Sequence, residues 1–397
     1  MPTALPMTDV VLAGPARTPI GTFLGALAEM TAPALGAVAA RESLGRANVN
    51  PADVDEAIIG NVLSAGVGQN CARQVARGAG LPDECGATTV NKVCGSGLKA
   101  VMLAAQAIRC GDARVVLAGG TESMSRSPYL LQRARTGLRM GHAQLVDSML
   151  HDGLTDAYGD FHMGTCGDAC AAHYQFTREQ QNAFAIASYT RAIEAQSKGW
   201  FADEIVPVDV STGKTTARVA DDEQPKRFDE AKLRKLRPAF GETGTVTAGN
   251  ASGISDGAAT ILVMSAARAR ELGVRPVARV LGYATAAREP AWFTTAPIGA
   301  MRRLLESLSL TVGDVDLFEI NEAFAVVPMA AMRDLEIPHD KVNVTGGAVA
   351  LGHPIGASGC RVLVTLLNAL EKRDKRVGVA SLCIGGGEAV AVAVERL

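Results

Sequence analysis

The stretch VNKVCGSGLKAVMLAAQAIRCGDARVVLAGG, Val90 to Gly120, passes from a β-rich segment through a glycine-rich turn into an apolar helical run and on to a second β-rich segment. Residues 342–388 repeat this order, with VNVTGGAVALGHPIGASG, the helical run CRVLVTLLNALEKRD, the β-rich run KRVGVASL and a closing CIGGGE. Strands that alternate with helices are typical of α/β proteins. Two such units also occur by chance in an α/β protein. The matching Ser-Gly at the helix starts favours a chain of two similar halves.

The remaining sequence continues this alternation on both sides of a segment of different character. β-rich runs lie near residues 10–16, 56–63 and 87–93, and helical runs lie near 32–46 and around Gln74. Residues 123–250 contain more Met, Arg and Ser, a long amphipathic run at 178–199 and an irregular polar run at 211–233. We therefore predict an N-terminal half formed by 1–122 and 251–275, an inserted loop domain at 123–250 and a C-terminal half at 276–397.

Composition excludes several classes of protein. A net charge of −2 and an aromatic content of 4% in 397 residues give nucleic acid neither a basic face nor a stacking platform. No run of about 18 apolar residues predicts a membrane helix, and the N-terminal residues do not resemble a signal peptide. Eight cysteines in so long a chain are expected to be thiols, which favours a cytoplasmic protein.

One cluster of residues imitates a zinc site. His162, Cys166, Cys170 and His173 follow one another at intervals of four, four and three residues. On one helix these side chains would span about 16 Å, too far to meet at one ion about 2.0–2.3 Å from each ligand. We predict no metal site, and we expect the isolated cysteines to be mainly packing residues; these are Cys71, Cys85, Cys110 and Cys360.

Two residues at glycine-rich turns are candidates for nucleophilic chemistry. Cys94 precedes a helical run, where free N–H groups and the helix dipole are expected to lower its pKa toward the thiolate. Gly95 and Gly97 leave room for a carbonyl group to approach the backbone N–H groups. His353, between Gly352 and Pro354 at the second turn, is suited to act as the base for a thiol, although a structural role is open for both residues.

Two further segments carry polar groups in apolar surroundings. Cys383 ends a predicted buried strand and meets three glycines, which suggests a proton-transfer or acyl-transfer task. Asn321 and Glu322 interrupt the largely apolar run FEINEAFA, where buried polar groups need partners. The pattern allows a structural hydrogen bond or an oxyanion donor equally.

Taken together, the motifs VNKVCGSGLKA, GNASGISDGAA, NEAFA, GGAVALGHPIGASG and LCIGGGEA resemble those of the thiolase family, in the same order and over nearly the whole chain. The resemblance implies a duplicated five-layer αβαβα core with an inserted loop domain, commonly assembled as a tetramer. It also implies an acyltransferase that reversibly condenses two acetyl-CoA to acetoacetyl-CoA and CoA. No cofactor or metal is implied, because the CoA thioesters are themselves the substrates.

The resemblance assigns a role to each candidate residue. Cys94 would carry the acyl group as a thioester, and His353 would take its proton. Cys383 would remove the α-proton of the second acyl-CoA. Asn321 would hold a water that forms one oxyanion hole with His353, and the N–H groups of Cys94 and Gly385 would form the other.

The same likeness predicts where CoA thioesters bind. Arg227, beside Lys226, is expected to face the nucleotide phosphates. The run DGLTDAYGDFHMG resembles the family members that act on acetoacetyl-CoA, in which the His-Met pair narrows the acyl pocket. The residues expected to line the tunnel and the acyl pocket are Leu154, His162, Met163, Phe240, Ala248, Ser252 and Phe324.

One departure and several alternatives accompany this prediction. The family commonly continues after the His-Met pair with Thr-Ala-Glu, whereas this chain has Cys166, Gly167 and Asp168, which alters the expected shape of the pocket there. The first alternative is a longer-chain 3-ketoacyl-CoA thiolase of β-oxidation. A decarboxylating or initiating condensing enzyme would lack Cys383, and a non-catalytic scaffold would not need all four catalytic positions.

Overall fold

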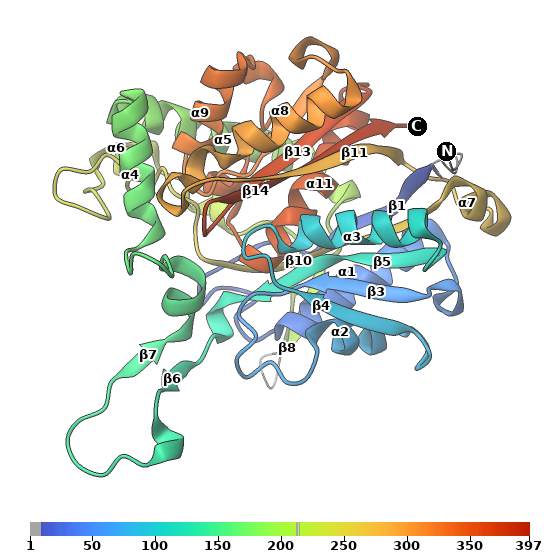
Figure 1. The fold of residues 1–397 in the computed structure, drawn as a ribbon, viewed down its shortest axis with the longest axis horizontal. Coiled ribbons are helices and arrows are strands. Elements are labelled where there is room, and N and C mark those ends of the chain that lie inside the picture. Colours follow the sequence, from blue (N-terminus) through green and yellow to red (C-terminus); the bar gives the residue numbers. More distant parts are fainter. Residues whose placement is uncertain (1–8, 212, 214) are drawn as a thin grey trace, which may run out of the picture.

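A computed structural model describes residues 9–211, 213 and 215–397, and its centre is one continuous mixed sheet (Figure 1). A short strand, β2 (Gly21–Thr22), pairs with β10 outside the main path. From edge to edge the strands are β4 (Gly86–Val90), β3 (Glu56–Gly60), β5 (Val115–Ser123), β10 (Ser255–Ser265), β1 (Val10–Arg17), β11 (Ala278–Ala287), β14 (Glu388–Arg396), β13 (Val377–Ile384) and β12 (Leu317–Ile320).

The sheet consists of two halves with one topology. β3 and β5 run parallel, and β10 and β1 follow as antiparallel neighbours; β12, β13, β14 and β11 repeat this order. The halves meet where β1 and β11 pair antiparallel, with Leu12 opposite Ala278. The predicted duplicated α/β fold is therefore confirmed.

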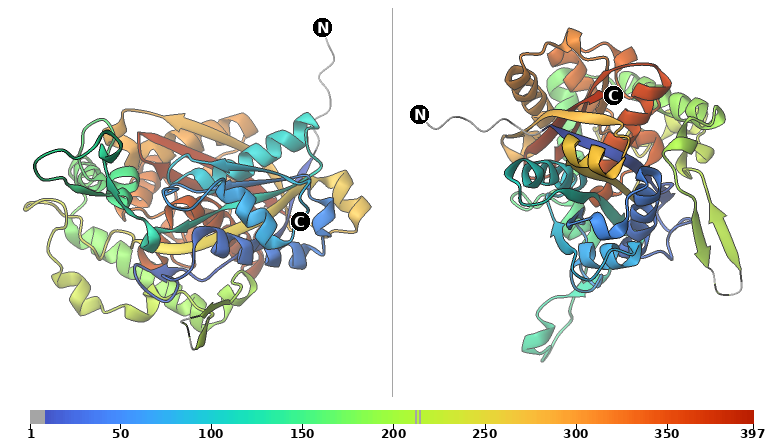
Figure 2. Two further views of the ribbon diagram at one scale, coloured as in Figure 1. Left: turned by 90° about the horizontal axis from the view of Figure 1, so that it is seen from below. Right: turned by 90° about the vertical axis from the view of Figure 1, so that its right-hand side faces the viewer.

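Helices form three layers around the two halves of the sheet. α1 (Ala32–Ala47) and α2 (Cys71–Ala79) cover the outer face of the N-terminal half, and α8 (Ala296–Leu308), with α9 (Val326–Leu335) beside it, covers that of the C-terminal half (Figures 1 and 2). Between them lie α3 (Ser96–Cys110) and α11 (Ile355–Lys372), which contact each other and strands of both halves. α11 is buried from Ile355 to Leu370, and its polar side chains, Ser358, Arg361, Thr365 and Asn368, are buried with the apolar ones.

One predicted strand is absent from the described fold. Residues 342–344 form only a bridge between Val342 and Phe318, at the position that β4 holds in the other half. The reason is Asn343, whose φ of 48° bends the chain and whose side chain bonds both backbone groups of Ile320, at 2.8 Å each. The amide thus replaces the hydrogen bonds of a strand ladder.

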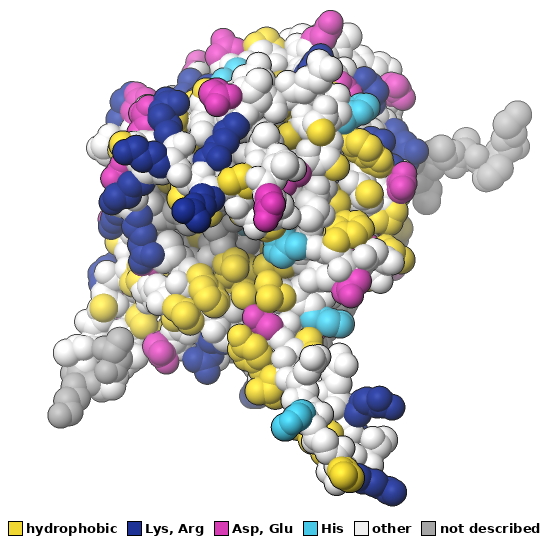
Figure 3. Space-filling model, turned by 90° about the vertical axis from the view of Figure 1, so that its left-hand side faces the viewer, with side chains coloured by type: hydrophobic (Ala, Val, Ile, Leu, Met, Phe, Trp, Pro, Cys, Tyr) yellow, Lys and Arg dark blue, Asp and Glu magenta, His cyan; other side chains and the backbone are white. Residues whose placement is uncertain are grey.

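Residues 123–250 extend over one end of the core and project beyond it as a hairpin of β6 and β7 (Figure 1). Hydrophobic side chains gather around a hollow on this end of the molecule, with Lys and Arg grouped to one side (Figure 3). No helix in the described ranges is long and apolar enough to cross a membrane.

The elements of residues 123–250 are β6 (Tyr129–Leu131), β7 (Leu145–Asp147), α4 (Met163–Tyr174), α5 (Arg178–Ser197), β8 (Val208–Ser211), β9 (Thr216–Val219) and α6 (Glu230–Lys235). Two further helices, α7 (Ala266–Leu272) and α10 (Ala348–Leu351), belong to the core.

Candidate active site

The two glycine-rich turns meet because helices α3 and α11 cross at backbone distance. A Cβ atom on Gly97 would lie 2.8 Å from the Cys360 nitrogen, and one on Gly359 would lie 2.2 Å from the Leu98 nitrogen. Real Cβ atoms do not approach so closely, so only glycine allows this crossing. The crossing brings the chain before each helix, with Cys94 and His353, to one place.

A cavity of about 350 Å³ opens where these two turns meet. Cys94, His353 and Gly385 line it, together with all but one of the residues expected to bind the substrate. Those are Leu154, His162, Met163, Phe240, Ala248, Ser252 and Phe324. Cys383 and Asn321 are not among the residues that line this cavity; both are buried beside it.

The turn that carries Cys94 is held in an unusual conformation. Val93 has a φ of 45°, which is rare for a β-branched residue. The Ser96 hydroxyl closes the turn, since it donates to the Val93 carbonyl at 2.6 Å and accepts from the Lys92 N–H at 2.8 Å. Lys92 forms an ion pair with Glu388 of the other half, so both halves fix the position of the thiol.

The prediction that the pKa of Cys94 is lowered toward the thiolate is wrong for the free protein. Burial raises the pKa of the thiol to about 11, although the N–H groups of Gly385 and of Cys94 itself lie near the sulfur and act in the opposite direction. Desolvation of the charged form therefore outweighs the helix start. The thiol is neutral at pH 7 and needs a base in order to react.

His353 is held as a neutral imidazole whose Nε2 is unprotonated. It follows α10, and its Nδ1 lies 2.6 Å from the Ser358 hydroxyl, which donates to the Pro354 carbonyl at 2.9 Å. Nδ1 is therefore the protonated nitrogen, and Nε2 is left as the acceptor. Burial, and next the positive charge of Arg361, lower the pKa of His353 to about 3.

Asn321 and Glu322 have different environments. The Nδ2 atom of Asn321 lies 3.4 Å from Nε2 of His353. Glu322 accepts hydrogen bonds from Ser188, Asn343 and the Val349 N–H, at 2.7–3.0 Å. Asn321 thus borders the site, whereas Glu322 holds together the loops that surround it.

Cys383 lies at the end of β13 and is fully buried. Burial raises the pKa of its thiol, and the nearby Cys94 sulfur raises it further. A second buried thiol near Cys94 has the chemistry to give or take a proton at this place.

His162 and Met163 stand where the predicted acyl pocket ends. The His162 ring stacks on Phe240 at 4.5 Å between centroids, and burial lowers the pKa of His162. The Met163 methyl group would lie 3.6 Å from a Cβ atom on Gly385. These side chains line the cavity beside Cys94.

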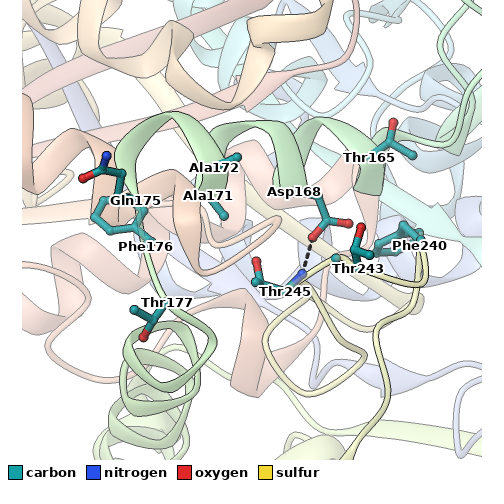
Figure 4. Close-up of a pocket in the computed structure, with 12 residues that line it drawn as sticks. Thr165, Asp168, Ala171, Ala172, Gln175, Phe176, Thr177, Phe240, Thr243 and Thr245 are labelled. Carbon is teal, nitrogen blue, oxygen red and sulfur yellow. Dashed lines mark hydrogen bonds between the residues drawn. The ribbon is translucent and has the colours of Figure 1, made fainter.

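The Cys-Gly-Asp departure has a structural consequence at α4. Asp168 accepts hydrogen bonds from the N–H groups of Thr245 at 2.7 Å and Val246 at 2.8 Å, and so anchors the loop that carries Phe240 (Figure 4). Cys166 and Cys170 are buried in the apolar core on α4. Within the described ranges no group of His, Cys, Asp or Glu could hold a metal ion.

Arg227 lies apart from the rest of the predicted set. Its guanidinium pairs with Glu223, and it borders a neighbouring cavity that shares Gly253 and Ile254 with the one beside Cys94. Its expected contact with nucleotide phosphates therefore stays a prediction.

Sequence reasoning missed several residues that shape the site. Ser358 fixes the tautomer of His353, and Ser96 closes the nucleophile turn. Glu122 accepts from the Val62 and Gly356 N–H groups and so ties the start of α11 to the end of β3. Arg361 is the single charge among residues 355–370, and that interruption was the available signal.

Comparison with known proteins gives the class to which this site belongs. The chain matches "Thiolase, N-terminal domain" over residues 10–267 and "Thiolase, C-terminal domain" over residues 274–396, and it belongs to the thiolase family. The predicted family, fold class and enzyme class, a thiolase acyltransferase, are confirmed.

The relatives define the protein more narrowly. It is 53% identical to acetyl-CoA acetyltransferase 2 of Arabidopsis thaliana, over 98% of this chain and 97% of the relative, and 53% identical to acetyl-CoA acetyltransferase of Pseudomonas aeruginosa, over 98% and 100%. Among solved structures, the acetyl-CoA acetyltransferase of Bacillus anthracis superposes with a TM-score of 0.96 at 40% identity, covering 98% of this chain and 99% of that one. Acat5 thiolase of Ascaris suum, in complex with coenzyme A, gives 0.93 at 43% identity, covering 98% and 100%.

Proposed function

We propose that this thiolase is an acetyl-CoA acetyltransferase that reversibly condenses two acetyl-CoA to acetoacetyl-CoA and CoA, with the acetyl group carried on Cys94. The observation that carries the proposal is the convergence of Cys94, the unprotonated Nε2 of His353 and the paired N–H groups of Cys94 and Gly385 on one cavity. Sequence identity of about half to acetyl-CoA acetyltransferases supports the same activity.

In the first half-reaction the Cys94 sulfur attacks the thioester carbon of acetyl-CoA. Its proton passes to Nε2 of His353, which is necessary because the thiol is neutral at pH 7. The N–H groups of Cys94 and Gly385 donate to the oxygen of the tetrahedral intermediate. The carbon–sulfur bond to CoA then breaks, and Cys383 gives its proton to the departing CoA thiolate.

In the second half-reaction the Cys383 thiolate removes a proton from the methyl carbon of a second acetyl-CoA. His353, now protonated, and Asn321, through the water that it holds, stabilise the enolate oxygen. The enolate carbon attacks the acetyl carbon on Cys94, the bond from that carbon to sulfur breaks, and the Cys94 thiolate recovers its proton from His353. All groups return to their starting states, and ping-pong kinetics follow.

The substrate range is proposed from the bulky side chains that line the cavity. His162, Met163 and Phe240 are among them, and the His162 ring stacks on Phe240, which supports a preference for short acyl groups. Thiolysis rates with CoA should therefore be highest for acetoacetyl-CoA and fall by about tenfold or more for six-carbon and longer 3-ketoacyl-CoA. Equal or faster thiolysis of long chains would refute the short-chain assignment and favour the β-oxidation alternative.

Assembly and location complete the proposal. A homo-tetramer is supported by the projecting β6–β7 hairpin, which exposes apolar side chains at Tyr129, Leu131 and Leu145. Light scattering of the purified protein tests it. A cytoplasmic location is supported by eight free cysteines, which a reducing compartment preserves, and cell fractionation tests it.

A further inference from the structure

A buried arginine lies directly behind the candidate active site. Arg361 is on the second turn of α11 and is only 2% exposed. Its Nη2 atom lies 3.4 Å from Oδ1 of Asn321, and its Nη1 atom lies 3.8 Å from the carboxylate of Glu319. Its Nε and Nη1 atoms have no hydrogen-bond partner within the described ranges.

Burial of Arg361 in this arrangement is energetically unfavourable. Burial of an arginine with an incomplete set of hydrogen bonds costs several kcal/mol or more, and an apolar side chain of similar volume is often neutral or stabilising at such a position. Arg361 shares one face of α11 with the uncharged polar residues Ser358, Thr365 and Asn368, and it is the one charged side chain among residues 355–370. Packing alone therefore does not account for a charged side chain here.

The contact with Asn321 has a direct chemical effect. The two ends of a carboxamide are almost equal in shape but opposite in polarity, so packing cannot select between them. A guanidinium has donors and no acceptor, so it accepts only the oxygen end of the amide as its neighbour. With Oδ1 held by Arg361, the Nδ2 donors face Nε2 of His353, 3.4 Å away.

We infer that Arg361 is a positioning residue, which fixes the orientation of the Asn321 carboxamide so that its N–H donors face the enolate-stabilising side of the site. This inference rests on the proposed function. Without Arg361 the amide can rotate and present an oxygen where the enolate oxygen develops. Repulsion between this amide oxygen and the enolate oxygen would slow condensation. Acetylation of Cys94 would be spared, because the thioester oxygen on Cys94 accepts from the other pair of donors, the N–H groups of Cys94 and Gly385.

The test separates the two half-reactions in an Arg361→Met variant. Acetylation of Cys94 by acetyl-CoA, followed by rapid-quench mass spectrometry, should stay within about threefold of wild type. The condensation kcat should fall about 10- to 100-fold, which is part of the loss expected for one missing oxyanion donor. Arg361→Lys should recover part of this loss, because it retains a cationic donor. Thr365→Val is the control variant. It removes a buried hydroxyl group, which lies one turn further along α11 and donates to Glu204, and it should leave both rates unchanged.

A double-mutant cycle with Asn321→Ala decides whether Arg361 acts through Asn321. In the Asn321→Ala background, the Arg361→Met change should cost nothing further in condensation. The same cost in both backgrounds, or an unchanged condensation rate in Arg361→Met alone, would overturn the inference. If Arg361→Met does not fold, the pair Glu319→Gln and Arg361→Gln removes both buried charges at similar volume and enters the same cycle. Absence of acetyl-Cys94 in the wild-type protein would instead contradict the proposed function.

Discussion

At the scale of residues, the site is a set of neutral groups and not a preformed ion pair. Burial raises the pKa of Cys94 to about 11 and lowers that of His353 to about 3, so both shifts favour the thiol beside the uncharged imidazole. In the proposed reaction, charge develops only when the acyl group arrives, and the N–H groups of Cys94 and Gly385 donate to it there. Such an arrangement protects a nucleophile from reacting in the absence of substrate.

The state of Cys94 leads to a pH dependence. For a thiol with a raised pKa, the thiolate fraction rises about tenfold for each pH unit below that pKa. Alkylation of Cys94 by iodoacetamide should therefore increase continuously from about pH 7 to about pH 10, as read from the modified peptide. The exposed Cys110 provides a reference thiol in the same sample. A plateau of the Cys94 rate near pH 7 would mean that the thiolate already predominates.

The residue scale is also where sequence reasoning succeeded in part. Cys94 and His353 were marked as candidates by their glycine-rich turns before helical runs, and Cys383 by the three glycines that follow its strand end. The direction of the Cys94 pKa shift could not be predicted, because it depends on desolvation by segments far away in sequence. Gly385 and the Ile384 side chain, which would lie 2.3 Å from a Cβ atom on Gly95, come from the other half of the protein.

At the scale of elements, the crossing of α3 and α11 decides whether the site exists. A methyl group on Gly359 would lie 2.2 Å from the backbone nitrogen of Leu98, and the neighbouring atom is backbone that cannot move aside. Gly359→Ala should therefore destabilise the fold by about 2–4 kcal/mol and separate Cys94 from His353. Urea unfolding and acetylation of Cys94 measure the two effects.

Gly45→Ala is the matched control for that substitution. Gly45 lies inside α1, and a Cβ atom there would meet nothing within 4 Å. The change should stabilise the protein by about 0.5–1 kcal/mol, because alanine loses less backbone entropy in a helix. Equal effects of the two substitutions would contradict the role given to the crossing.

Helices and strands were predicted well where the hydrophobic periodicity was strong. They were predicted poorly where side-chain hydrogen bonds take the place of backbone hydrogen bonds. The helical run at 96–110 and the strands near it follow directly from their apolar patterns. The predicted strand at 342–344 failed because Asn343 satisfies the backbone of Ile320 with its own amide. The hydrophobic pattern of a sequence does not show where a side-chain amide replaces the hydrogen bonds of a strand.

At the scale of the whole molecule, buried charges join the inserted segment to the core. Arg17, at the end of β1, is fully buried and bonds Glu204 at 2.6 Å and both carboxylate oxygens of Asp222 at 2.7 and 2.9 Å. Glu204 also accepts from Thr365 and Asn368 on α11. The segment that lines the cavity is thereby fixed to both halves, although its predicted boundaries at 123 and 250 stay a prediction.

Loss of Arg17 should be strongly destabilising because the carboxylates of Glu204 and Asp222 would remain buried without the opposite charge that Arg17 supplies. Arg17→Met is expected to lower the free energy of unfolding by about 3–5 kcal/mol. Lys198→Met breaks the exposed pair with Glu194 and should change it by less than about 1 kcal/mol. Urea denaturation of both variants makes the comparison, and similar small losses would show that Arg17 does not fix the segment.

In the proposed reaction, the thiol of Cys94 carries the acetyl group between two CoA molecules. Peptide mass spectrometry of the protein quenched after brief exposure to acetyl-CoA tests it most directly, with Cys94→Ala as the control. We predict an acetyl group on the peptide that contains Cys94, its loss on addition of CoA, and no acetylated peptide in Cys94→Ala. An acetyl group on another residue that turns over with CoA while Cys94 stays unmodified would contradict the account.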